Sequence, residues 1–280
     1  MDYAAQIHLF LSQDPGRPGD PPDQSPGGSR TLSHPPDWTP GPDETLEPFA
    51  QGRLWLLQQK RGYRFSLDAV LLGALATLRS GERVIDLGTG CGIVVLWLAC
   101  RFRDCSFTGV ELQPALARLA EQNARLNGLA DRVQIVQADM RGVAQHFPTA
   151  AFEVVVSNPP YRPLKAGRLN PDTEKAIARH ELAGSLGTVA HAAAYLLPHG
   201  GRLYLIYPAW RLVSLCGILR THGLEPKTLR FIHSRATAPA GLIWLEARKH
   251  SREALQILPP LTIYDECGQY TSEAQACFDL

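Results

Sequence analysis

The sequence predicts an α/β fold with a mostly parallel sheet and helices on both of its faces. Four short runs of β-branched and other apolar residues lie between residues 83 and 157, and helical patterns separate them. A strand, a helix and a second strand in this order form a right-handed unit with parallel strands. Repeated units of this kind build a sheet that is buried on both sides.

The elements are expected in the following order. A strand over Arg53–Gln58 precedes a helix over Ser66–Leu78, for which Ser66 is a suitable N-cap. The four central strands are expected over Arg83–Leu87, Ser106–Glu111, Val133–Ala138 and Phe152–Ser157, and crossover helices over Leu96–Phe102 and Pro114–Leu126. The C-terminal part adds helices over Glu174–Leu196 and Trp210–Thr221 and strands over Arg202–Tyr207, Lys227–Ile232 and Gly241–Ala247. Apolar surroundings place Trp97, Trp210 and Trp244 in the core.

Composition divides the 280 residues into a tail and one domain. Proline and glycine crowd the stretch before residue 44, where too little apolar surface is available to offset chain entropy. We therefore expect residues 1–43 to form a disordered tail and residues 44–280 to form one domain. Since 45% of the chain is hydrophobic, this domain can bury a substantial core.

The same composition predicts a cytoplasmic protein without a membrane partner or a bound metal. No apolar run reaches the roughly 20 residues of a membrane-spanning helix, and the N-terminus lacks the pattern of an export signal. The six cysteines include no C-x-x-C pair and no histidine partner at metal-ligand spacing, so reduced and mostly buried thiols are expected.

Basic residues concentrate in the C-terminal part, although the formal net charge of the chain is only +1. Between His199 and Arg252 the acids are Glu225 and Glu246, whereas the basic residues are Arg202, Arg211, Arg220, Lys227, Arg230, Arg235, Arg248, Lys249 and Arg252. A phosphate-binding patch and an ordinary solvated surface both fit this pattern.

A glycine-rich turn follows the first central strand. The run VIDLGTGCG at residues 84–92 ends a buried strand and opens a helix, where glycines let the chain turn tightly and a ligand approach the backbone. Its spacing is G-x-G-x-G (Gly88, Gly90, Gly92) rather than the G-x-G-x-x-G of dinucleotide folds, which favours S-adenosylmethionine over NAD. A plain tight turn is the alternative.

Acidic residues end three of the central strands. Asp86 precedes the glycine turn, Glu111 ends the next strand and Asp139 follows the third. Glu111 is placed to accept hydrogen bonds from two ribose hydroxyls, and Asp139 to accept one from an adenine amine. Each acid alone fits a surface cap, but three around one sheet edge favour a nucleoside cofactor.

The sequence Asn158-Pro159-Pro160-Tyr161 follows the fourth central strand and is the most specific motif of the chain. A conjugated NH2 group is a poor nucleophile, because its lone pair is delocalised. The Asn158 side-chain oxygen and the Pro159 carbonyl can each accept one N–H, while Tyr161 stacks on the flat substrate. The alternative is a Pro-Pro turn with Tyr161 in the core.

These motifs resemble those of class I methyltransferases with an N-P-P-Y motif, and within them the bacterial tRNA1(Val) adenine-37 N6-methyltransferase family. QKRGYRFSLDAVLL at residues 59–72, ARHEL at 178–182 and YDECGQYT at 264–271 are also similar to that family. The likeness runs from about Glu44 to the C-terminus, and the Pro-rich tail has no counterpart.

The resemblance implies a Rossmann-like, mostly parallel seven-stranded sheet whose last strand is antiparallel. It implies that S-adenosylmethionine is held by Arg64, Asp86, Gly88, Gly90, Gly92, Glu111, Asp139 and Asn158, and that Asn158, Pro159 and Tyr161 carry catalysis. The expected reaction is methylation of the N6 amine of an adenine in RNA, with tRNA as the expected partner. After the motif, Arg162, Lys165 and Arg168 fit either phosphate contacts or a solvated loop, and His180 fits a structural or RNA-orienting role.

Three other functions compete with this one. A glutamine amide offers the same planar NH2, so a glutamine-N5 methyltransferase acting on a release factor is the main alternative; such enzymes have a helical N-terminal domain where this chain has a Pro/Gly-rich tail. A DNA adenine methyltransferase needs a further sequence-reading domain. A non-enzymatic RNA-binding protein would not need the intact motif at 158–161. The sequence makes no prediction of oligomeric state.

Overall fold

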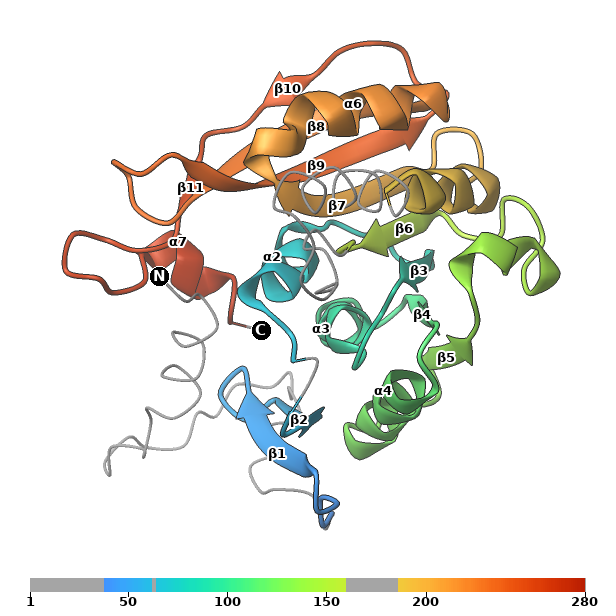
Figure 1. Ribbon diagram of the computed structural model, residues 1–280, viewed down its shortest axis with the longest axis vertical. Helices are drawn as coiled ribbons and strands as arrows, with labels where there is room; N and C mark the ends of the chain where they lie inside the picture. The colour runs from blue at the N-terminus through green and yellow to red at the C-terminus, as the bar shows by residue number, and fades with distance from the viewer. Residues whose placement is uncertain (1–37, 62–63, 160–185, 280) are drawn as a thin grey trace, which may run out of the picture.

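The computed structural model describes residues 38–61, 64–159 and 186–279. One sheet dominates it, with strand order β10-β8-β9-β7-β6-β3-β4-β5 and with β11 also paired to β8 (Figure 1). The strands from β8 to β5 are the seven that the sequence predicts; in chain order they are β3 (Arg83–Leu87), β4 (Ser106–Glu111), β5 (Val133–Gln137), β6 (Val154–Ser157), β7 (Arg202–Pro208), β8 (Leu224–His233) and β9 (Ala240–Lys249). β9, the last of them, pairs antiparallel with both β7 and β8, as expected.

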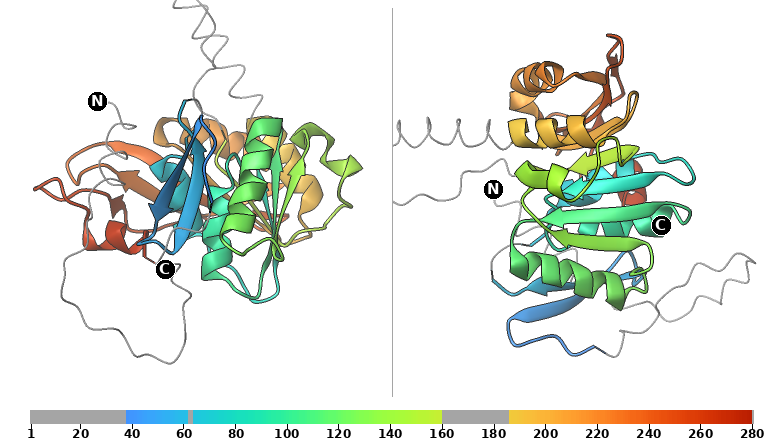
Figure 2. Two further views of the ribbon diagram at one scale, coloured as in Figure 1. Left: turned by 90° about the horizontal axis from the view of Figure 1, so that it is seen from below. Right: turned by 90° about the vertical axis from the view of Figure 1, so that its right-hand side faces the viewer.

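Helices cover both faces of this sheet (Figure 2). One core lies under α2 (Leu67–Leu75), α3 (Ile93–Arg101) and α4 (Pro114–Leu126). The other lies under helical residues 186–196 and α6 (Leu212–Thr221). Neighbouring residues of one strand alternate between these cores, as Val154 and Val155 do in β6, because side chains of a strand point to opposite faces. Within the described residues, no helix is both long enough and apolar enough to cross a bilayer.

The predicted central strands and crossover helices are confirmed, with bounds that differ from the predicted ones by at most three residues. β3, β4 and α4 match residue for residue. The first crossover helix begins at Ile93 instead of Leu96, because Gly92 adopts a left-handed conformation as its N-cap and the helix starts directly after the glycine turn. Ser66 occupies the N-cap of α2, but its side chain makes no capping hydrogen bond.

A β-hairpin before the main sheet was only half predicted. β1 (Glu44–Phe49) pairs antiparallel with β2 (Leu54–Gln59), and the pair forms a separate two-stranded sheet. β1 alternates polar and apolar residues weakly, which is why the sequence indicated only its partner. The hairpin docks on α4 through Asn127, whose side chain accepts from the backbone N–H of Trp55 and donates to its carbonyl, both at 2.8 Å.

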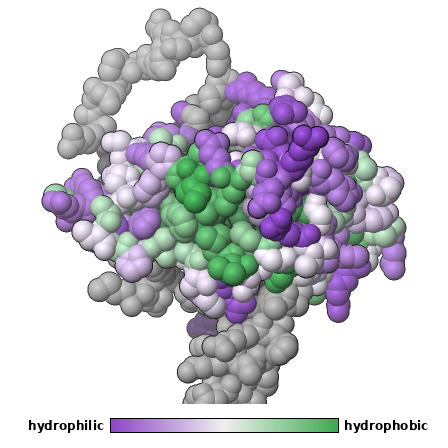
Figure 3. All heavy atoms as spheres, turned by 90° about the horizontal axis from the view of Figure 1, so that it is seen from above, coloured by the Kyte–Doolittle hydropathy of each residue, from purple (hydrophilic) through white to green (hydrophobic). Residues whose placement is uncertain are grey.

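Short elements extend the free side of β8. β10 (Gln256–Ile257) and β11 (Leu261–Thr262) both pair in parallel with β8, and α7 (Ser272–Ala276) follows. None of them was predicted, since strands of two residues and a helix of five residues are too short to show a periodic pattern. Figure 3 shows a group of apolar side chains on one face of the molecule. Among the exposed apolar residues are Val213 in α6, Ile257 in β10 and Leu255, which directly precedes β10. Two short strands thus shorten the open edge of the sheet.

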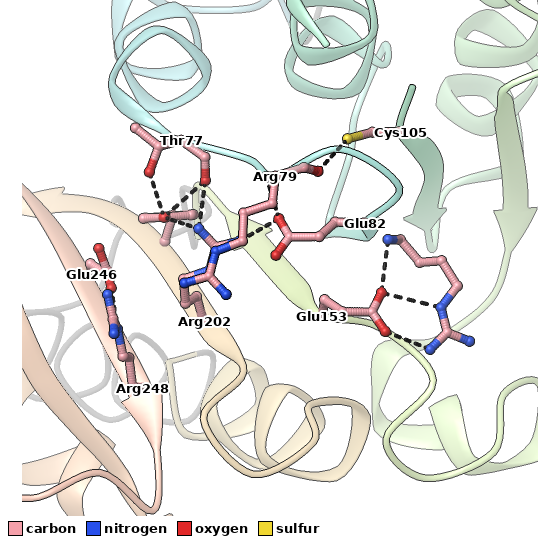
Figure 4. A network of polar contacts seen from close by, with 10 residues as sticks. Thr77, Arg79, Glu82, Cys105, Glu153, Arg202, Glu246 and Arg248 are labelled. Atoms are coloured by element: carbon pink, nitrogen blue, oxygen red, sulfur yellow. Dashed lines mark hydrogen bonds and ion pairs between the residues drawn. The ribbon is translucent and has the colours of Figure 1, made fainter. Parts of the chain in front are cut away.

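A buried ion pair holds the amino edge of the sheet together (Figure 4). The Arg202 guanidinium at the start of β7 pairs with Glu82 before β3, and their side chains are only 8% and 11% exposed. Arg202 also donates to the Thr77 carbonyl at 2.8 Å, and Glu82 accepts from the Arg79 N–H at 2.8 Å. Each charge therefore has several partners, which a buried ion pair requires.

We expect Arg202→Met to lower the free energy of unfolding by about 3–5 kcal/mol, because it leaves the Glu82 carboxylate buried without its cation. The control is Arg83→Met, which removes the more exposed pair with Glu153 and should cost less than about 1 kcal/mol. Urea unfolding of both variants measures the difference. Equal losses would show that the two ion pairs contribute alike.

Candidate active site

The candidate site lies where β3, β4 and β6 end. β3 pairs in parallel with both β4 and β6, and Asp86 lies opposite Gly109 on one side and Val156 on the other. The Ser157 hydroxyl donates to the Leu87 carbonyl at 2.7 Å. This bond joins the last residues of β3 and β6, so Gly88 and Asn158 each follow directly after one of two hydrogen-bonded residues at the same end of the sheet.

The glycine turn after β3 forms a backbone cradle. Gly88, Gly90 and Gly92 all have positive φ angles, of 83°, 59° and 89°. A Cβ atom on Gly92 would also lie 3.2 Å from the Ala120 Cβ in α4, so a larger residue there would push α3 and α4 apart. The N–H groups of Gly88 and Thr89 donate to the Val110 carbonyl at 2.9 and 3.0 Å, which fixes the turn against β4.

Glu111 at the end of β4 is buried and locked in place. Its Oε2 accepts from the Gly90 N–H at 2.9 Å and its Oε1 from the Gln113 N–H at 2.8 Å. Each carboxylate oxygen keeps a second lone pair, so two hydroxyls of a ribose still find acceptors. Leu112 is exposed beside it and offers an apolar surface for a planar base; the sequence signal was an apolar residue directly after the strand-ending acid.

Asp86 is a buried carboxyl group with unused hydrogen-bonding capacity. Among the described residues its Oδ2 has no hydrogen-bond partner. Burial is the main cause that raises the pKa of Asp86 to about 7; nearby Thr89 opposes the rise, and the negative charge of Glu111 adds a smaller part of it. A cationic or hydrogen-bond-donating ligand next to Oδ2 would stabilise the charged form.

Asp139 has a local partner in the structure. Its side chain caps the short helix η1 (Met140–Gln145) by accepting from the Arg141 N–H at 2.9 Å, and the Arg141 guanidinium lowers its pKa. The adjacent Met140 methyl group would lie 3.6 Å from a Cβ atom on Gly88, so the end of β5 does reach the glycine turn. A contact between Asp139 and an adenine amine stays a prediction.

Arg64 lies near the glycine turn but is engaged elsewhere. Its guanidinium contacts both carboxylate oxygens of Glu47 on the hairpin, at 2.6 and 2.7 Å. Its charge is close enough to the Cys91 thiol to oppose the burial that raises the pKa of Cys91 to about 11. A role for Arg64 at the cofactor therefore requires it to share its charge between Glu47 and the ligand.

Asn158 has a side-chain oxygen that accepts no hydrogen bond from the described residues. Its side chain is half-buried, and Oδ1 is shielded from solvent without a hydrogen-bond partner among the described residues. Pro159 is buried next to it. An unmade hydrogen bond of this kind costs about 1–3 kcal/mol, which an incoming N–H would recover. Tyr161 lies outside the described residues, as do Arg162, Lys165, Arg168 and His180.

Residues 67–208 match the family described as the methyltransferase small domain. The chain belongs to this family. It therefore uses S-adenosylmethionine as methyl donor, and the residues of the cradle fit such a ligand: the glycine turn leaves room for it, Glu111 suits its ribose, and the Asp86 oxygen without a partner suits its ammonium group. The predicted fold class and enzyme class are confirmed.

Known proteins similar to this methyltransferase carry more specific names. It is 31% identical over 226 residues to the tRNA1(Val) (adenine(37)-N6)-methyltransferase of Mannheimia succiniciproducens, covering 76% of this chain and 85% of that protein. The protein of that name from Pedobacter heparinus is 30% identical over 178 residues, or 63% and 73%. The crystal structure of a predicted O-methyltransferase from Agrobacterium tumefaciens shares the fold, with a TM-score of 0.63, 22% identity and coverage of 76% and 98%.

Asn123 is a positioning residue of the methyltransferase that the sequence did not indicate. Fully buried on α4, its amide donates to the Cys91 carbonyl of the glycine turn at 2.9 Å. It also accepts from the Leu57 N–H at 2.7 Å and donates to the Leu57 carbonyl at 3.1 Å. One side chain thus ties the hairpin to the cofactor cradle. The available signal was the spacing of Asn123 and Asn127, four residues apart on one helix face.

The basic C-terminal stretch is largely an ordinary paired surface. Arg220 contacts Glu225 and Glu253, Arg230 contacts Glu273, and Arg248 contacts Glu246.

The prediction that Trp210 lies in the core is wrong, since it is 73% exposed in the 3-10 helix η2 (Ala209–Arg211), whereas Trp97 and Trp244 are buried.

For Asp86→Asn we expect a stabilising effect that depends on pH. The folded-state pKa of about 7 exceeds the ordinary 3.8, so the folded protein holds this proton more tightly than the unfolded chain does. Stability from this group is therefore present at low pH and is lost as pH rises from 3.8 to about 7. The variant should gain on the wild type by up to about 1.4 kcal/mol per pH unit across that window.

Urea unfolding of the cofactor-free protein at pH 5 and pH 8 measures this gain in stability. Calorimetry should show that Asp86→Asn binds S-adenosylmethionine at least about tenfold more weakly than the wild type does. Asp139→Asn is the control of opposite sign, because its pKa is lowered and its contribution to stability is lost as pH falls. A difference between Asp86→Asn and wild type that is the same at both pH values would refute a buried, protonated Asp86.

A second pair of variants separates the cradle from the hairpin. Asn123→Leu removes the bond to Cys91 and both bonds to Leu57, so it should weaken cofactor binding about tenfold and cost about 2 kcal/mol of stability or more. Asn127→Leu removes only bonds to the Trp55 backbone and to its own helix, so it should cost stability and leave cofactor affinity unchanged. Equal cofactor affinities in the two variants would show that Asn123 does not position the turn.

Proposed function

We propose that this methyltransferase transfers the methyl group of S-adenosylmethionine to the exocyclic N6 amine of an adenine in tRNA, in the cytoplasm. The observation that carries the proposal is the shielded Asn158 Oδ1, which has no hydrogen-bond partner among the described residues and follows the strand whose last residue is bonded to Leu87, next to the glycine turn. The names of its relatives from Mannheimia and Pedobacter support the choice of an adenine in tRNA as the target.

The chemistry of an aromatic amine explains what Asn158 and Pro159 do. The nitrogen lone pair of adenine N6 is delocalised into the ring, so the amine must be held in a fixed orientation before it reacts. Asn158 Oδ1 accepts one N–H and the Pro159 carbonyl accepts the other, which aims the nitrogen and draws electron density toward it. When bound, S-adenosylmethionine would supply a methyl group on a positively charged sulfur, which leaves as a neutral thioether, and the methylated amine then gives up one N–H proton to water.

The remaining site residues hold the two reactants in place. Glu111 accepts hydrogen bonds from the ribose, Asp86 faces the ammonium group, and Gly88, Gly90 and Gly92 let the backbone approach. In this proposal Tyr161 stacks on the target base, Asp139 accepts from the cofactor's adenine, and Arg64 closes over the methionine end. A base held in this way has left its helical stack, which favours an unpaired nucleotide as substrate.

The direct test is Asn158→Ala. We expect methyl transfer to tRNA to fall about 100-fold or more, because the amine loses one of its two fixed acceptors. Cofactor affinity should stay within a few fold of the wild type, since the glycine turn, Asp86 and Glu111 are untouched. Transfer of labelled methyl groups and calorimetry measure the two effects. Near-normal transfer by this variant would remove Asn158 from the mechanism.

Substrate class is tested by offering two acceptors side by side. Purified protein and labelled S-adenosylmethionine are incubated with tRNA from cells that lack this modification and, separately, with a release factor carrying an unmethylated glutamine. We expect label in tRNA, retained as N6-methyladenine after digestion. Label in the release factor and none in tRNA would replace the proposal with glutamine methylation.

A further inference from the structure

Trp210 is exposed at the carboxyl ends of the parallel strands, where the candidate site also lies. It lies in η2, directly after the end of β7, and β7 is the neighbour of β6 in the sheet (Figure 1). Its indole is 73% exposed, although tryptophan is usually withdrawn from solvent in folded proteins. An exposed indole at this end of the sheet is available to stack on a flat group of a ligand.

Arg211, the next residue, is buried, and no carboxylate of the described part of the chain forms an ion pair with it. It is 8% exposed, and its Nε has no hydrogen-bond partner among the described residues. Its guanidinium carbon lies 4.6 Å from the centre of the Trp210 ring. Other arginines of the C-terminal part, such as Arg220 and Arg230, contact glutamates. A buried guanidinium whose N–H groups are not all hydrogen-bonded destabilises the folded protein, and a bound anion would offset this cost.

The strand register sets how far this pair lies from the methyl-transfer site. β6 and β7 run parallel, with Ser157 opposite Leu205. Asn158 is one residue beyond this pair and Trp210 is five, so Trp210 lies at most roughly 13 Å further along the strand direction. The charge of Arg211 also opposes the burial that raises the pKa of Tyr207, which places the guanidinium back toward β7. Neighbouring nucleotides of one RNA strand cover such a distance.

We propose that Trp210 and Arg211 bind an unpaired nucleotide of the RNA substrate next to the adenine that is methylated. The indole stacks on the base, and the guanidinium donates hydrogen bonds to a phosphate oxygen. This inference rests on the proposed function. RNA fits better than a protein partner, because one splayed strand supplies a flat base, a phosphate and the neighbouring target adenine together.

The test measures steady-state methylation of unmodified tRNA by the full-length protein. Trp210→Ala and Arg211→Gln should each raise KM for tRNA about tenfold or more, with a smaller change in kcat and an unchanged affinity for S-adenosylmethionine. Trp210→Phe keeps a flat ring and should restore most of the affinity. Arg211→Gln should also reduce the salt dependence of tRNA binding by about one unit of slope.

The matched control is Val213→Ala, which truncates another exposed side chain three residues further along and should leave KM unchanged. If wild type methylates tRNA and both variants keep its KM, this inference is wrong and the proposed function stands. If wild type neither binds nor methylates tRNA, both are wrong. Loss of release-factor methylation in Trp210→Ala, with tRNA methylation intact, would assign the surface to a protein and overturn the inference.

Discussion

The register of β3 against β4 and β6 is the constraint on which the site depends. Because these strands run parallel and end at one edge, Asp86, Glu111 and Asn158 meet there although 72 residues separate the first from the last. The Ser157 hydroxyl on the Leu87 carbonyl fixes the last step of this register. A slip of one residue would send these side chains to the other face of the sheet.

Buried polar groups have partners at the amino ends of the parallel strands but lack them at the carboxyl ends, among the described residues. At the amino edge, Arg202 and Glu82 satisfy each other and several backbone groups, which serves stability. At the carboxyl edge, Asp86 Oδ2, Asn158 Oδ1 and Arg211 Nε are shielded without partners among the described residues. Such groups destabilise the free protein, and each of them has the chemistry to bind part of a substrate or cofactor.

The sequence predicted the parts of the fold that rest on local patterns. Apolar periodicity and the glycine turn sufficed for β3, β4 and α4 and for the presence of the other central strands along the chain, and the motif at 158–161 indicated the candidate site. It missed β1, whose polar and apolar residues alternate only weakly, and β10 and β11, which have two residues each. It also missed the link from Asn123 to the glycine turn, which only packing reveals. Trp210 was misplaced because its apolar neighbours suggested burial, whereas η2 turns it outward at the end of β7.

The central claim is that two fixed oxygen acceptors at the sheet edge hold a flat amine. A crystal structure of the protein with S-adenosylhomocysteine and a short adenine-containing tRNA hairpin tests it most directly. The account predicts that adenine N6 lies about 3 Å from both Asn158 Oδ1 and the Pro159 carbonyl oxygen. A target base bound elsewhere, or an Asn158 side chain hydrogen-bonded within the protein in that complex, would contradict it.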